Sequence, residues 1–592
     1  MKEIFIKKLI VFIKNHYFIL IIGAFLSLII LGPVIIYPFV SKETYQGINI
    51  AYFGSDAHFY TARAKEALEG HKLGNPLLQE GKNNQDLYFM YNERLLTAPL
   101  RLAGMQNVNI VTVYNIYNFI GIFIIILLIY FFVLQLSGDK LLAIASAISV
   151  VGGYHIIYNK TLFYNDFNIY GRAMYPYISS LAFFAYLNLL IKSIKTEKLE
   201  HALLAGLLFG FLFYVYFYTW TFALALNSAL LLLYFINRDR VKLKTIALIM
   251  AIGFLVGLYN LIKISLFFSS EAGVQASYFF WSAYGRAPIF SKIGAVALLL
   301  LGIFKYKKRQ DPNITLIFAL ILAIWISLNQ QILTGRILQI GHYYWYFIVP
   351  VAIIVGLYMI WFLIKKELWR KIFFVLLILI IFLHAGIGQY RSMLTTLELK
   401  NYEQLYKPII NNLKNDTNPK VILAADDQFE CLFTIYTNHD LFWNSAATLS
   451  DIPVDRISDA LYIYIYLNKE ARDDFSGYIN RVMKNEESQS FYKDLYKTIE
   501  GYQSGFDFYQ YNNRSARQDE IIIKQRKELI AVLSAEYESL FEDSNSISSL
   551  LNKYKINYIV WDKNNYPEWD LSFIDNKEEI ISNNNIILYK LN

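Results

Sequence analysis

GSDAHFYTARAKEALEGHKLGNP, residues Gly54–Pro76, follows the first apolar stretch of the chain that is long enough to cross a membrane. Ser55 is a suitable N-cap and Gly70 a suitable residue to end a helix, and the apolar residues between them recur at helical spacing. The pattern predicts a short amphipathic helix on the membrane surface. Asp56 falls in its first turn, where the helix dipole favours an ionised carboxylate that is available to a metal ion or a proton. The alternative is that Asp56 is only a second capping group.

Composition places the chain among polytopic membrane proteins. Of its 592 residues, 56% are hydrophobic and 17% aromatic, and long apolar runs recur through the first two thirds. The single cysteine, Cys431, excludes an internal disulfide framework. The net charge is +8, and most of the short basic clusters lie between apolar runs. Clusters in that position indicate membrane topology, and we therefore predict no nucleic-acid partner.

The apolar runs predict about eleven transmembrane helices. The first, Tyr17–Val40, follows four lysines and lacks a cleavage site, so we expect a retained helix with a cytoplasmic N-terminus. Ten more are expected near residues 109–136, 140–158, 174–191, 202–218, 221–236, 245–267, 288–304, 313–328, 343–364 and 370–388. Lys/Arg-rich connections such as NRDRVKLK and KYKKRQD alternate with less basic ones, which fits the positive-inside rule. We therefore expect an integral cell-membrane protein whose C-terminal domain is extracytoplasmic.

Four segments on the expected outer side are long or polar enough to build a site. They are Ser41–Val108, Asn159–Pro176, Ser269–Pro288 and Asn329–Trp345. Each mixes aromatic residues with a few charges, and for most of the aromatic residues an interfacial belt is a sufficient explanation.

The composition changes after about Gln389, which divides the chain into a transmembrane domain, 1–389, and an extracytoplasmic α/β domain, 390–592. Val421–Ala425, Tyr558–Trp561 and Asn585–Leu591 have the pattern of strands, and Asp519–Leu533 has that of a helix. The fold class is therefore a polytopic α-helical membrane protein with a C-terminal α/β domain.

Motifs of soluble enzymes, such as a P-loop, HExxH or a Gly-x-Ser-x-Gly elbow, are absent from the sequence. Ionisable residues gather instead in the outer segments near helix ends, where such groups are often retained for ligands. Asp86, Glu93 and Lys82 we interpret as incidental charges of a solvated loop. The residues with a possible role in a site are Asp56, His58, Arg63, Asp166, Arg172, Glu271, Arg286, Gln330, Gln331, Arg336 and His342.

A first transmembrane helix followed by a large outer loop that opens with SDAHFYTARAKEALEG resembles the GT-C superfamily of integral membrane glycosyltransferases. Asp166, in YNDFNIYGR, stands where members often have a second acidic residue, and an outer C-terminal domain is common among them. The resemblance implies transfer of a hexosyl or pentosyl group from a polyprenyl-phosphate or polyprenyl-diphosphate carrier at the membrane. The WWD-type motif of oligosaccharyltransferases is absent, so the acceptor, whether lipid, glycan or protein, stays open.

The implied chemistry assigns roles to several of these residues. Asp56 is expected to be the base that activates the acceptor hydroxyl, and with a phosphate leaving group this implies direct displacement with inversion. Asp166 is expected to bind a metal or orient the acceptor rather than to act as a nucleophile. Arg172, Arg286 and Arg336 offer charged, bidentate contacts to phosphate. A divalent cation, Mg or Mn, is a possible cofactor, with Asp56, Asp166 and Glu271 as ligands.

Asn329–Trp345 is the second most informative segment. Gln330, Gln331, Arg336 and His342 give it more hydrogen-bonding capacity than a connector needs, which suits a sugar or a lipid phosphate. A solvated hairpin is the alternative. His58 and Arg63, which follow Asp56, are further candidates for substrate contact, and Glu271 is either a metal ligand or a loop charge.

Two other functional classes fit some of these observations. A transporter or lipid-carrier flippase also has many spans, but its ionisable residues lie inside them more often, whereas here Lys263 is the exception. A membrane-anchored sensor would place its function in the outer domain alone. The gathering of polar residues in the outer loops favours an interfacial active site.

Overall fold

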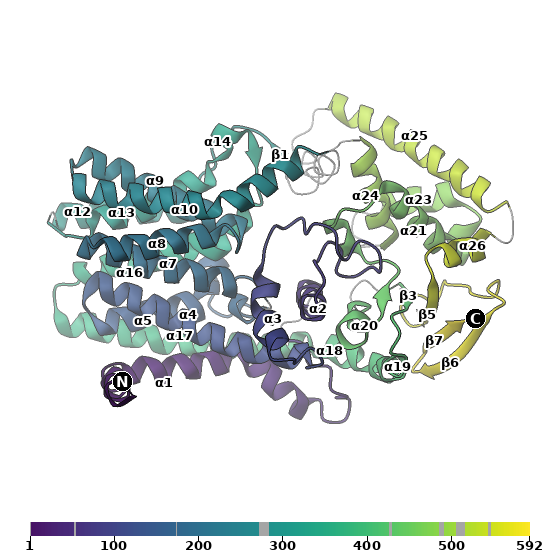
Figure 1. Cartoon of the computed structure of the whole chain (residues 1–592), viewed down its shortest axis with the longest axis horizontal. Coiled ribbons are helices and arrows are strands. Elements are labelled where there is room, and N and C mark those ends of the chain that lie inside the picture. Colours follow the sequence, from purple (N-terminus) through teal and green to yellow (C-terminus); the bar gives the residue numbers. More distant parts are fainter. Residues whose placement is uncertain are drawn as a thin grey trace.

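A computed structural model gives the arrangement of the whole chain in two halves, one helical and one α/β (Figure 1). The structure describes residues 2–51, 55–172, 174–270, 283–308, 310–425, 429–484, 491–504, 516–542 and 546–592. The N-terminus lies at the far end of the helical half and the C-terminus at the far end of the α/β half.

Within the described residues, eight segments are long and apolar enough to cross a membrane. They correspond to α1 (Lys2–Val40), α4 (Ile110–Ser137), α7 (Tyr177–Thr196), α9 (Phe217–Ile236), α10 (Arg240–Phe268), α13 (Ile314–Leu328), α16 (Val349–Leu363) and α17 (Glu367–Thr395). The remaining predicted spans coincide with three shorter helices, α5 (Lys140–Gly152), α8 (Leu199–Leu212) and α12 (Lys292–Lys307). The protein is thus an integral membrane protein, while the count of eleven spans stays a prediction.

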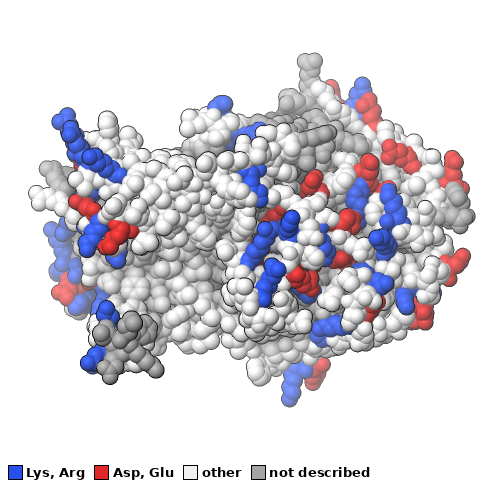
Figure 2. All heavy atoms as spheres, viewed as in Figure 1, with Lys and Arg blue, Asp and Glu red and all other residues white. Residues whose placement is uncertain are grey.

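Surface charge marks the part of the molecule that meets the bilayer. On the face shown in Figure 2, a nearly uncharged band crosses the helical half, with Lys, Arg, Asp and Glu at the far end of this half and across the α/β half. This distribution is what a hydrocarbon layer requires, because charged groups are costly within it.

Small residues let α8 and α10 approach closely in the helical half. A Cβ added at Gly210 would lie 2.4 Å from the Cβ of Val256, and one added at Gly253 would lie 2.1 Å from the ring of Phe209. Helices in a bilayer associate through such tight van der Waals contact. Gly210 and Gly253 therefore allow α8 and α10 to pack closely against each other.

The α/β half is built on a five-stranded mixed sheet with the strand order β4-β3-β5-β7-β6. Its strands are β3 (Val421–Ala424), β4 (Asp440–Leu441), β5 (Ile556–Asp562), β6 (Lys577–Asn583) and β7 (Ile586–Leu591). β3 pairs in parallel with β4 and β5, and β7 pairs antiparallel with β5 and β6. The three predicted strands, in β3, β5 and β7, are confirmed; β6 was not predicted because its sequence KEEIISN is largely polar and half-exposed.

Helices of the α/β half pack beside the sheet and against one another. They are α18 (Leu397–Glu403), α19 (Lys407–Leu413), α20 (Cys431–Tyr436), α21 (Val454–Leu467), α22 (Lys469–Arg472), α23 (Phe475–Lys484), α24 (Phe491–Ser504), α25 (Ala516–Leu540) and α26 (Ser546–Lys553). α25 contains the predicted helix Asp519–Leu533. α17 continues without a break past the predicted domain boundary at 389/390, and that boundary stays a prediction.

The helix of the opening stretch, α2 (Ser55–Glu69), lies where the two halves meet (Figure 1). It ends as predicted before Gly70, whose φ is +110°. Of its described side chains only those of Asp56 and Glu69 are well exposed. The expectation of a helix resting on the membrane surface is therefore wrong: α2 is enclosed, because the α/β half covers the face that was expected to meet solvent.

The loop that follows α2 is joined to the sheet of the α/β half. The backbone N–H of Leu441 donates to the carbonyl of Leu77 at 2.8 Å, and Leu78 pairs in parallel with Leu441. This segment therefore extends the sheet beyond β4. The loop that carries Asp56 and the C-terminal domain form one continuous structure.

Candidate functional site

An exposed carboxylate and a mostly buried guanidinium meet where two outer segments come together. Asp56 stands at the N-terminus of α2 with 56% of its side chain exposed, and Arg172, with 14% exposed, contacts it through a terminal guanidinium nitrogen. Arg172 follows a short 3₁₀ turn, Ile169–Gly171, in the second outer segment. Its Nε is buried and has no partner among the described residues. Because the two residues lie far apart in the chain, their contact could not be predicted from the sequence alone.

Asp166 lies in the same outer segment as Arg172. It is half-buried, and one carboxylate oxygen accepts a hydrogen bond of 2.8 Å from the backbone N–H of Phe167. Burial raises the pKa of the Asp166 carboxyl, and this hydrogen bond opposes the rise. The structure describes no direct contact between Asp166 and Asp56.

A metal site at Asp56 has incomplete support in this arrangement. Within the described residues, neither Asp56 nor Asp166 belongs to a group of three carboxylate or imidazole side chains at mutual ligand distance. Glu271, the third expected ligand, lies outside the described residues. Asp56 and Asp166 therefore do not make a complete cation site by themselves, and the expectation of a divalent cation at Asp56 stays a prediction.

Aromatic rings line the helical half next to Arg172. The ring of His342 shares a hydrogen bond of 2.7 Å between Nδ1 and the hydroxyl of Tyr216 and stacks on Tyr346, with centroids 5.5 Å apart. The positive charge of Arg172 is close enough to act on both His342 and Tyr346. His342 thus belongs to the surroundings of the Asp56–Arg172 pair, as a hydrogen-bonding group at the mouth of a span.

Arg63 lies inside the protein rather than at a substrate site. With 2% of its side chain exposed, it donates from Nε to Glu93 at 2.6 Å and from a terminal nitrogen to Asp86 at 2.9 Å. The rings of Phe59 and Tyr88 cover the guanidinium. Two predictions are corrected here: Arg63 is not placed to contact substrate, and Asp86 and Glu93 are not incidental loop charges. They are buried because the loop folds back onto α2.

His58 is also buried and paired. Its Nε2 lies 2.8 Å from a carboxylate oxygen of Glu403 at the end of α18, and neither side chain is exposed. A substrate cannot reach His58 in this conformation, which corrects the expectation of substrate contact. The pair instead fixes the first turn of α2, and with it Asp56, to the α/β half.

The polar side chains of the last outer segment serve mainly its own backbone. Gln331 is buried and donates to the carbonyl of Ala287 at 3.0 Å, which removes it from substrate contact. Gln330 donates to the carbonyl of Arg336 at 2.8 Å, and Arg286 donates to the carbonyls of Ile332 and Leu333 at 2.6 and 2.9 Å. These bonds, with the pairing of β1 (Ala283–Tyr284) and β2 (Arg336–Ile337), hold a hairpin-like unit together.

In that unit the side chains of Arg286 and Arg336 remain exposed at the surface. Arg286 has its guanidinium engaged by two carbonyls, so its assignment to a phosphate contact loses support. Arg336 retains that assignment as a proposal.

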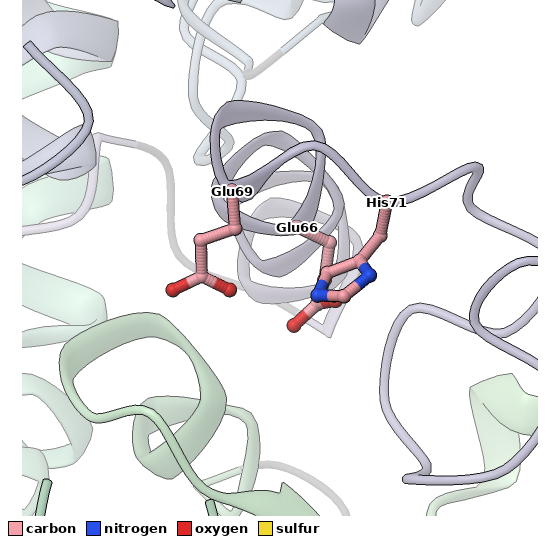
Figure 3. A group of neighbouring side chains, drawn as sticks. All are labelled: Glu66, Glu69 and His71. Carbon is pink, nitrogen blue, oxygen red and sulfur yellow. The ribbon is translucent and has the colours of Figure 1, made fainter. Parts of the chain in front are cut away.

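A second charge cluster, not anticipated from the sequence, joins α2 to the sheet. Glu66, Glu69 and His71 bring possible metal-ligand atoms within 4.8 Å of one another (Figure 3). Lys82 already supplies a cation there, because its ammonium group lies 2.9 Å from both carboxylate oxygens of Glu66 and 2.5 Å from Asp440. Lys82 is therefore an interdomain ion-pair partner, which corrects the interpretation as a solvated loop charge.

One ammonium group faces two buried carboxylates in this cluster. Burial is the largest cause that raises the pKa of Glu66, to about 7; Lys82 opposes the rise, while Glu69 and Asp440 add to it. Burial likewise raises the pKa of Asp440, and Lys82 again opposes the rise. Part of the cluster is thus expected to exchange a proton near neutral pH.

The cluster predicts a pH dependence of stability. Because the folded protein holds the Glu66 proton more tightly than the unfolded chain does, the free energy of unfolding should fall as pH rises from about 5 to about 7. The slope is at most about 1.4 kcal/mol per pH unit for each proton involved. The melting temperature of the wild type minus that of Glu66→Gln should decrease over this window. A difference that does not change with pH contradicts the assignment, and the exposed Glu398→Gln serves as control.

Comparisons with known proteins give a distant likeness in structure. No family model and no curated protein matches the chain. Among solved structures, the chain is similar to the oligosaccharyltransferase of Archaeoglobus fulgidus in complex with Zn and sulfate, at a TM-score of 0.47 and 12% identity. That match covers 77% of this chain and 66%, just under two thirds, of the other.

A second solved structure is the oligosaccharyltransferase AglB of the same organism, in complex with an inhibitory peptide and a dolichol-phosphate. The TM-score is 0.46 and the identity 11%, over 93% of this chain and 70% of that one.

Proposed function

We propose that this integral membrane protein is a glycosyltransferase that moves a sugar from a polyprenyl-phosphate or polyprenyl-diphosphate carrier to an acceptor at the outer face of the membrane. The observation that carries the proposal is the Asp56–Arg172 pair, an exposed carboxylate beside a mostly buried guanidinium. A displacement at an anomeric carbon needs a base on the acceptor and a cation on the leaving phosphate. The pair provides one of each.

Asp56 acts as the base in the proposed step. Its carboxylate takes the proton of the acceptor hydroxyl while that oxygen forms a bond to the anomeric carbon. The bond from this carbon to the carrier phosphate breaks, and the phosphate leaves with the electron pair. One displacement of this kind inverts the anomeric configuration. Retention would instead need a second carboxylate as nucleophile about 5 Å from the first.

Arg172 holds the leaving phosphate in this proposal. A guanidinium is always charged and can donate two parallel N–H···O hydrogen bonds to two oxygens of a phosphate. Its Nε has no partner in the described structure, so one donor is still available when the terminal nitrogen rests on Asp56. Binding of the phosphate therefore draws Arg172 towards the donor and leaves the carboxylate of Asp56 to the acceptor.

The remaining assignments complete the site. Asp166 orients the acceptor from the neighbouring turn, and His342 and Arg336 contact the sugar or the phosphate from the last outer segment. The N-terminus is placed in the cytoplasm and the C-terminal domain outside, where it meets the lipid, glycan or protein acceptor.

Turnover of a lipid-linked donor is the direct test. Purified protein in nanodiscs is incubated with polyprenyl-phosphate and polyprenyl-diphosphate sugars, and release of the sugar-free carrier is measured by mass spectrometry. Time-dependent release that requires the protein supports a transferase. Movement of an intact carrier across the bilayer without any release would instead indicate a flippase and overturn the proposal.

A further inference from the structure

Lys263 is an ionisable residue in α10, a helix that packs on α8 with one side and exposes apolar side chains on another. It lies in α10, five residues before the end at Phe268 and so about 7–8 Å below it along the helix axis. Neighbouring side chains of the same helix, among them Tyr259, Ile262 and Leu266, are 62%, 50% and 68% exposed. A cation at this depth is placed near the lipid headgroups of the outer leaflet.

The Lys263 side chain reaches towards α3 (Asn92–Leu102), which belongs to the outer loop. Its ammonium nitrogen lies 3.4 Å from the hydroxyl of Tyr91, 6.0 Å from the centroid of the Tyr91 ring and 5.6 Å from that of Tyr259. Arg94 lies over the same Tyr91 ring, 5.5 Å from its centroid. Two cations therefore share one aromatic ring at the membrane boundary.

No carboxylate balances these charges among the described residues. Glu93, next to Arg94 in the chain, is bound to Arg63. One terminal nitrogen of Arg94 donates to the backbone carbonyl of Lys72, and its Nε is buried without a partner. Two like charges in a partly apolar setting repel each other and are costly there, so an anion placed between them would be stabilised.

We propose that Lys263, Arg94 and Tyr91 bind the phosphate group of an anionic lipid in the outer leaflet. The ammonium and guanidinium groups contact the phosphate oxygens, and the Tyr91 hydroxyl donates a third hydrogen bond. The lipid chains lie along the exposed face of α10, beside Ile262 and Leu266. This site is separate from the Asp56–Arg172 pair, and it does not depend on the proposed glycosyl transfer.

The same phosphate chemistry has two sources, a membrane phospholipid or the polyprenyl phosphate carrier. Binding to the detergent-purified full-length protein is measured by native mass spectrometry with phosphatidylglycerol, polyprenyl phosphate and zwitterionic phosphatidylcholine as separate probes. We expect both anionic lipids, or one of them, to bind more tightly than phosphatidylcholine. Preference for one anionic probe identifies the source, whereas equal binding of all three lipids overturns the site.

Lys263→Met combined with Arg94→Met should weaken binding of the anionic lipid about 30-fold, because each basic group near the lipid surface contributes about 1 kcal/mol. Lys263→Arg should retain most of the affinity, which separates loss of charge from loss of fold. Lys292→Met, which removes an exposed lysine from the first turn of α12, is the matched control and should leave affinity unchanged. Wild-type affinity in the double variant, at an unchanged melting temperature, overturns the proposal.

The test also separates this site from the transferase. Asp56→Asn should bind the anionic lipid as the wild type does, even where it releases no carrier. Loss of lipid binding in Asp56→Asn would overturn the separate site, because the lipid would then occupy the Asp56–Arg172 region.

Discussion

Replacing Asp56 with asparagine is expected to lower the rate of sugar transfer by about 10²- to 10⁴-fold, the range by which a positioned base accelerates proton transfer. Asparagine has the same shape and still accepts a hydrogen bond from Arg172, so the fold should be retained. It cannot take the proton of the acceptor hydroxyl. The rate of carrier release at saturating donor, compared with the wild type at equal melting temperature, measures the effect.

Two further variants show whether such a loss belongs to the base. Glu69→Gln removes the other well-exposed carboxylate of α2, at the opposite end of the helix, and should leave the rate unchanged. Arg172→Gln should raise the KM for the donor as well as lower kcat, because the phosphate loses its guanidinium partner. Undiminished transfer in Asp56→Asn would remove Asp56 as the base while leaving the enzyme class intact.

The helices and several strands were predictable because their signal is local. An apolar run of membrane length must form a helix in lipid, where the backbone satisfies its own hydrogen bonds. Gly70 ends α2 as predicted because it adopts a left-handed conformation, with φ of +110°. β3 is buried on both faces and so reads as a continuous apolar run, whereas β6 is half-exposed and polar, and was missed.

The site was less predictable because charge pairing depends on residues far apart in the chain. Lys82 was interpreted as a solvated loop residue, but in the fold it forms an ion pair with Asp440 of the α/β half. His58 and Glu403 form a buried pair in the same way. In the last outer segment, Gln331 was recognised as a hydrogen-bonding residue, but the sequence could not reveal that its partner is a backbone carbonyl. For Gln331 the capacity to form a hydrogen bond could be predicted from the residue type, whereas the partner depends on the fold.

Arg63→Met is expected to reduce the free energy of unfolding by about 3–5 kcal/mol, the usual cost of removing one partner from a buried ion pair. Asp86 and Glu93 would remain buried without their cation. Burial already raises the pKa of Asp86, and the charge of Arg63 is what opposes this rise most strongly. Thermal unfolding in detergent, followed by intrinsic fluorescence, should show a much lower melting temperature.

The cause of that loss can be isolated by removing the charges as well. A triple variant, Arg63→Met with Asp86→Asn and Glu93→Gln, should recover much of the lost stability, because neutral groups are less costly to bury than unpaired charges. If Arg63 instead contacted substrate, Arg63→Met would lower activity at an unchanged melting temperature, and the triple variant would be no more stable than the single one. Stability and activity measured on the same preparations therefore decide between two roles for Arg63. It either stabilises the packing of α2 against the loop that carries Asp86 and Glu93, or it contacts substrate near Asp56.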